Sequence, residues 1–65
     1  ENFIWINHGD YSQVINLRTN KSWRFNCGDI IQGSFIYNIL SNDNETFFMT
    51  NDGVTIYSWD RGEYE

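Results

Sequence analysis

Apolar and polar residues alternate along most of this chain with a period of two, which is the pattern of β-strands. The clearest alternation covers residues 22–27, where Trp23, Phe25 and Cys27 are predicted to face inward. Six such segments follow one another, separated by short turns rich in Gly, Asn and Asp. The pattern predicts strands over residues 3–7, 11–17, 22–27, 34–40, 47–50 and 54–59.

The segments between these strands predict how the strands are joined. Asn51-Asp52-Gly53 is a strong hairpin signal. Residues 28–33 predict a tight connection or a bulge, and residues 61–65 predict a frayed polar tail. We therefore predict a single all-β domain over residues 1–65. Its fold is a small antiparallel meander of about six strands that closes into a barrel or forms two packed sheets.

Composition supports strands and limits how the domain is stabilised. The chain has 65 residues and twelve aromatic residues (three Trp, four Tyr and five Phe), but no Ala and only two Leu. A chain of this size buries only about 60% of the surface it exposes when unfolded. A single Cys27 excludes an internal disulfide, and Cys27 with the lone His8 is too few for a structural zinc site. We expect no metal or cofactor, so close packing or a partner must stabilise the domain.

Charge is distributed unevenly along the chain. Residues 1–39 balance to zero, whereas residues 40–65 hold six acidic residues against Arg61, and so carry the whole net charge of −5. The negative electrostatic field of residues 40–65 attracts partners with a basic surface and repels nucleic acid. No segment reaches the roughly 20 apolar residues needed to cross a membrane, and the free thiol of Cys27 fits a reducing compartment. We predict a cytoplasmic protein, located in the host cytoplasm if it is phage-encoded.

Several predicted strands are apolar on both faces. In residues 54–59, Val54 and Ile56 share one face, while Tyr57 and Trp59 share the other. Residues 3–7 and 34–40 show the same property. An antiparallel sheet normally turns one polar face to water. Either these surfaces are simply apolar, as protein surfaces often are, or one face is covered by a partner.

The covered face is predicted to be aromatic. Aromatic side chains with a polar tip are favoured at the centres of protein interfaces, and acidic residues around them would steer a basic partner. The partner is either a protein with a basic surface or a second copy of the chain, forming a homodimer. The predicted partner-binding residues are Trp5, Tyr37, Tyr57, Trp59, Asp52, Asp60 and Glu63.

Catalysis is not expected. The one cluster with a candidate base is His8-Gly9-Asp10, and a glycine turn capped by Asp10 explains it more simply. Cys27 lies on a predicted inward face, where it acts as a small apolar residue rather than a nucleophile. The best hypothesis is a non-enzymatic protein-binding module. Small size, acidity and an amino-acid composition typical of AT-rich coding genomes favour a phage-type inhibitor of a host protein.

Two alternatives remain open. Arg18, Lys21 and Arg24 crowd one hairpin beside Trp23, as in small barrels that bind single-stranded nucleic acid. These three hairpin cations stand against nine acidic residues in the whole chain, which gives too little positive charge for strong contacts to phosphates. A carbohydrate-binding module is the second alternative. Its candidate residues are Trp59, Tyr57, Asn51 and Asp52.

Overall fold

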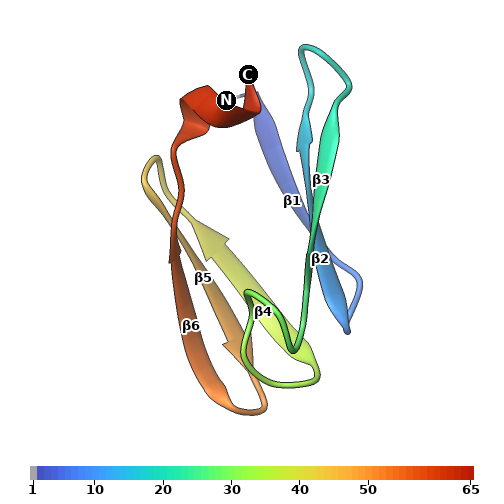
Figure 1. The fold of residues 1–65 in the computed structure, drawn as a ribbon, viewed down its shortest axis with the longest axis vertical. Coiled ribbons are helices and arrows are strands. Elements are labelled where there is room, and N and C mark those ends of the chain that lie inside the picture. The colour runs from blue at the N-terminus through green and yellow to red at the C-terminus, as the bar shows by residue number, and fades with distance from the viewer. Residues whose placement is uncertain (1) are drawn as a thin grey trace.

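The computed structural model describes residues 2–65 and shows an all-β domain, as predicted (Figure 1). Six strands are followed by a short 3₁₀ helix, η1. The elements are β1 (Phe3–Asn7), β2 (Tyr11–Asn16), β3 (Ser22–Asn26), β4 (Ile36–Ser41), β5 (Glu45–Thr50), β6 (Gly53–Ser58) and η1 (Arg61–Tyr64).

The strands form two separate three-stranded sheets rather than a closed barrel. Each sheet is an antiparallel meander, with the order β1-β2-β3 in the first and β4-β5-β6 in the second. The two sheets face each other across a shared interior, and η1 lies at the end of the molecule where β1 begins (Figure 1). The described residues therefore form the second of the two predicted architectures, two packed sheets.

The connection between the sheets is a loop anchored at several points. Ile31 is fully buried and pairs with Cys27 through an isolated bridge. The Asn51 side-chain oxygen accepts hydrogen bonds from the backbone N–H groups of Ser34 (3.0 Å) and Phe35 (3.2 Å). Gly33 has a φ of +102°, and a Cβ there would lie 2.7 Å from the Thr50 hydroxyl, so only glycine fits.

Aromatic rings fill the interior and join the two sheets. Trp5 of β1 stacks on Phe25 at 5.4 Å between ring centroids and meets Phe48 of β5 edge-on at 5.5 Å. Phe25 of β3 also lies 5.1 Å from Tyr57 of β6. We call the connected rings the aromatic core. It comprises Phe3, Trp5, Trp23, Phe25, Phe48, Tyr57, Trp59 and Tyr64.

A β-bulge changes the faces predicted for β4. Simple alternation puts Ile36 and Ile39 on opposite faces. The register with β5 instead shifts between Ile36 and Asn38, so that Tyr37 is an extra residue. Ile36 is fully buried, and Ile39 packs against the same interior. The prediction for this strand was wrong because alternation assumes an unbroken ladder.

The predicted frayed tail is also wrong. The Asp60 side chain caps η1 by accepting a hydrogen bond from Gly62 N–H at 3.0 Å. Tyr64 is only 8% exposed, and its hydroxyl lies 2.9 Å from that of Tyr57. The fully buried Asn16 donates its side-chain N–H to the Tyr64 carbonyl at 2.9 Å. Burial of one aromatic ring and these bonds hold the segment on the sheets.

The environment of Tyr64 also affects its ionisation. Burial raises the pKa of the Tyr64 hydroxyl well above its usual value, and the hydrogen bond to Tyr57 raises it further. The nearby Tyr57 and Glu63 add electrostatic contributions in the same direction. The folded state therefore strongly prefers the neutral hydroxyl.

We predict that Tyr64→Phe lowers the free energy of unfolding by about 1 kcal/mol, because one hydroxyl pair is lost. Tyr64→Ala removes the buried ring as well and is expected to cost about 3–5 kcal/mol. Urea unfolding followed by Trp fluorescence measures both. The matched control is Tyr37→Ala, at a residue that is 64% exposed. A Tyr64→Ala cost no larger than that of the control would contradict the packed position of η1.

We further predict that stability falls as the pH rises above about 10, the pKa of an unfolded tyrosine. Because the pKa of Tyr64 is higher in the folded state, the unfolded chain loses its proton first, and alkaline conditions favour unfolding. The free energy of unfolding measured at increasing pH should show this slope. The slope should be shallower in Tyr64→Phe, and an equal slope in both proteins would refute the assignment to Tyr64.

Candidate interaction surface

Three of the four aromatic residues predicted to form a surface patch belong to the aromatic core. Trp59 is only 6% exposed, and Trp5 and Tyr57 pack against the buried core residues. The predicted aromatic patch therefore does not form on the surface. The physical reason is area, because a Trp or Tyr side chain buries about 150–250 Å², more than Val or Ile. When both faces of a strand are apolar, the aromatic face gains more from burial.

The other predicted binding residues lie far from one another. Tyr37 is exposed at the β4 bulge, where its ring lies 5.4 Å from that of Phe35. Asp52 is in the β5–β6 turn, whereas Asp60 and Glu63 belong to the η1 region at the opposite end of the molecule (Figure 1). These three acids therefore do not form one rim.

The apolar surface is instead on the outside of the second sheet. Cross-strand pairing places Leu40 opposite Phe47 and Phe47 opposite Ile56, so one apolar row crosses all three strands. Met49 and Val54 form a second, adjacent pair on the same face. We call these five residues the outer apolar face. Sequence alternation identified the Val54 and Ile56 face as apolar, but did not show that it would be the exposed one.

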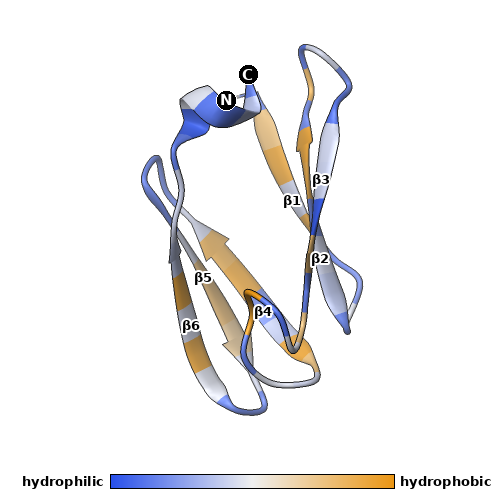
Figure 2. Ribbon diagram, viewed as in Figure 1, coloured by the Kyte–Doolittle hydropathy of each residue, from blue (hydrophilic) through white to orange (hydrophobic). Residues whose placement is uncertain are grey.

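This face is well exposed. Leu40, Val54 and Ile56 keep 55%, 56% and 59% of their surface accessible, and Phe47 and Met49 are partly exposed. Apolar positions recur along β4, β5 and β6 in Figure 2. Isolated exposed apolar residues are common, but a contiguous cluster across three strands is typical of an interaction site.

Acidic residues border the outer apolar face. Glu45 lies on the same face as Phe47, two positions along β5, and is partly buried opposite Ser58. Asp43 and Asp52 are in the two turns of this sheet. Residues 36–58 contain these three acids and no Lys or Arg. Arg61 of η1 pairs with Asp43, so among the described residues Glu45 and Asp52 are the acids that leave net negative charge around the apolar surface.

The outside of the first sheet is different, because polar and cationic side chains interrupt it. Arg24 lies 3.7 Å above the Tyr11 ring and donates a hydrogen bond to Asn26 at 2.7 Å. Trp23 points inward and meets Tyr64 edge-on at 4.8 Å between ring centroids. Trp23 is partly buried by this packing, so only part of its ring remains available as a platform for stacking bases.

Other candidate residues are held in structural contacts. The His8 ring stacks on Tyr11 at 4.3 Å and pairs with Gln13 at 3.0 Å. Partial burial raises the pKa of the Cys27 thiol, and the Asp10 carboxylate raises it further. Cys27 therefore remains a thiol at neutral pH rather than a reactive thiolate.

The four residues predicted for a carbohydrate site also do not lie together in the structure. Trp59 and Tyr57 belong to the interior, and Asn51 uses its side chain to hold Ser34 and Phe35. Asp52 is exposed in the turn beside Asn51. These four residues do not converge on one surface.

Within residues 2–65, no three His, Cys, Asp or Glu side chains lie close enough together to hold a metal ion. In the same part of the chain, no helix has the length and apolar character needed to cross a membrane. Comparisons with protein-family models, curated proteins and solved structures found no match.

We predict that Val54→Thr/Ile56→Thr changes the free energy of unfolding by less than about 1 kcal/mol. Both side chains are more than half exposed, and threonine keeps the strand preference. The control Ile36→Thr should cost about 2 kcal/mol or more, because Ile36 is fully buried and the new hydroxyl enters an apolar interior. Chemical denaturation compares them. Equal costs would mean that the outer apolar face stabilises the fold itself.

Proposed function

We propose that this protein is a non-enzymatic binding module that docks its outer apolar face on another protein. The observation that carries the proposal is the pairing of Leu40, Phe47 and Ile56 into one exposed row across the second sheet. The fold leaves this contiguous row outside although the domain is small and its core is limited.

Charge supports a partner with an apolar centre and a basic rim. Asp43, Glu45 and Asp52 border the face without any cation in residues 36–58. Asp43 is paired with Arg61, so a second copy of the chain docked face to face would bring four carboxylates, Glu45 and Asp52 of each copy, together without compensation. The proposed occupant is therefore a different protein whose Lys or Arg residues meet these acids.

The size of the molecule supports a docking surface that extends beyond the five apolar residues. A stable complex buries about 800 Å² on each partner, which is roughly a fifth of the 4062 Å² exposed here. The outer apolar face would supply the centre, and Tyr37 with the acidic turns would supply the edge. A small module that covers a partner's surface in this way would act as an inhibitor, in the manner of small phage proteins. The free thiol of Cys27 supports a reducing, cytoplasmic setting.

The test is to capture the partner from an extract of the source cells, purify it, and measure binding by calorimetry. Val54→Thr/Ile56→Thr is expected to raise the Kd about a hundredfold, because each residue contributes more than 1 kcal/mol at the centre of the contact. Ile4→Thr/Leu17→Thr is the matched control. This control removes two exposed aliphatic side chains, one from β1 and one from the turn after β2, and should leave the Kd unchanged.

Salt gives a second measurement. The association rate should fall as NaCl is raised, because charge steers the encounter. Equal losses of binding in the two double variants would overturn the proposal. Sedimentation showing a dimer that Val54→Thr/Ile56→Thr disrupts would also overturn it, since the occupant would then be a second copy.

A further inference from the structure

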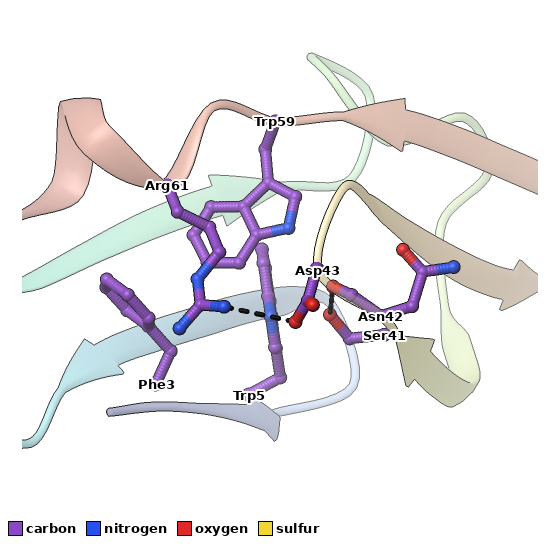
Figure 3. A pocket seen from close by; sticks show the side chains of 7 residues that line it. All are labelled: Phe3, Trp5, Ser41, Asn42, Asp43, Trp59 and Arg61. Atoms are coloured by element: carbon purple, nitrogen blue, oxygen red, sulfur yellow. Dashed lines mark hydrogen bonds and ion pairs between the residues drawn. The ribbon is translucent and has the colours of Figure 1, made fainter. Parts of the chain in front are cut away.

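A cavity of about 310 Å³ opens between the two sheets and contains none of the five residues of the outer apolar face. It lies between β1, the β4–β5 turn and the segment that follows β6 (Figure 3). This volume is at the lower end of the range for small-molecule sites, which suits one small ring rather than an extended ligand. The residues that line it are Phe3, Trp5, Ser41, Asn42, Asp43, Trp59 and Arg61.

The aromatic wall of the cavity is held rigidly. Trp59 meets the Phe3 ring edge-on at 5.1 Å and the Trp5 ring edge-on at 5.4 Å. Trp5 is held in turn by its contacts in the aromatic core. A wall fixed on both sheets is preorganised, so a ligand would lose little free energy in ordering it.

The polar wall presents opposite charges that cancel. Arg61 donates a hydrogen bond to the Asp43 carboxylate at 3.0 Å, and its guanidinium lies 5.2 Å from the centre of the Phe3 ring. The Ser41 hydroxyl and the Asn42 backbone carbonyl lie 3.3 Å apart beside this pair (Figure 3). Donors and acceptors therefore alternate over a short distance, and the lining has no net charge.

Two donors of the aromatic wall lack an acceptor. Among the described residues, the indole N–H groups of Trp5 and Trp59 are buried without a hydrogen-bond partner. Trp59 is only 6% exposed. Its indole nitrogen lies on the side of the ring that faces Asp43 (Figure 3). Leaving a buried N–H unpaired is unfavourable, so a ligand oxygen that reached either group would be bound more tightly.

We propose that this cavity binds a single neutral sugar ring. The C–H face of such a ring packs on aromatic side chains, and its hydroxyl groups both donate and accept hydrogen bonds. A hydroxyl can therefore donate to Asp43 and accept from Arg61 or from an indole N–H. A neutral ligand also leaves the charge balance of the Asp43–Arg61 pair undisturbed.

Other ligand classes match the lining less well. An anion would compete with Asp43 for Arg61, and a cation would compete with Arg61 for Asp43. A purely apolar ligand would leave both indole N–H groups unpaired. This sugar site shares Trp59 with the residues predicted from the sequence, but its polar groups come from the end of β4, the β4–β5 turn and η1.

The test follows the indole N–H resonances of the ¹⁵N-labelled protein during titration with the methyl glycosides of glucose, galactose, mannose and N-acetylglucosamine. The Trp5 and Trp59 resonances are expected to shift saturably with at least one sugar. Trp23 is outside the cavity and serves as an internal reference whose resonance should not move. Benzoate and benzylamine are the anionic and cationic probes, and tighter binding of either one would overturn the neutral-sugar assignment.

Two matched variants complete the experiment. Asp43 and Asp52 are turn aspartates at opposite ends of the same sheet, so each variant removes one charge from one turn. Asp43→Ala is expected to raise the Kd for the sugar about tenfold, whereas Asp52→Ala should change it less than about twofold. Absence of saturable shifts with every sugar, or equal losses in the two variants, would overturn the proposal. No docking partner is present in this titration, so its outcome is independent of the proposed function.

Discussion

Contacts between aromatic rings across the two sheets are the interaction on which this structure depends. Among the described residues the sheets share no backbone ladder, and one backbone hydrogen bond, from Ile36 N–H of β4 to the Gly9 carbonyl at 2.7 Å, joins them, so their alignment rests mainly on side chains. Trp5 reaches Phe48 in the opposite sheet, and Phe25 reaches Tyr57. The chain has no Ala, only two Leu and a single Cys, so large rings supply the buried area that aliphatic packing or a disulfide gives other small domains.

Sequence periodicity predicted the secondary structure well and the orientation of the strands poorly. Each predicted strand lies within about two residues of an observed one, because alternation and turn residues act locally. A period of two divides a strand into two faces without saying which is buried. Alternation therefore placed Val54 and Tyr57 on opposite faces correctly. The exposed patch was wrongly predicted on the aromatic face, which is buried, rather than on the aliphatic face. The Tyr37 bulge and the burial of Ile31 depend on contacts between distant segments, which local patterns do not contain.

The exposed aliphatic surface and the cavity both follow from an aromatic interior. Tyr57 and Trp59 occupy the inside of the second sheet, so Val54 and Ile56 on the alternate positions must face outward. Large rigid rings also meet at fixed angles and cannot fill every space at the end of a sandwich. The gap between Phe3, Trp59 and the β4–β5 turn lies at such an end. One choice of core residues thus creates two distinct surfaces.

The buried position of Tyr64 has a consequence for the order in which the domain folds. Its carbonyl bonds to Asn16, 48 positions earlier, and its ring closes over Trp23 and Trp59. Each sheet can form from strands that are neighbours in the sequence, whereas a contact between residues 16 and 64 requires the long chain between them to close first. Closure of this end of the core is therefore expected late in folding, and a folding intermediate without it exposes indole rings through which it can aggregate.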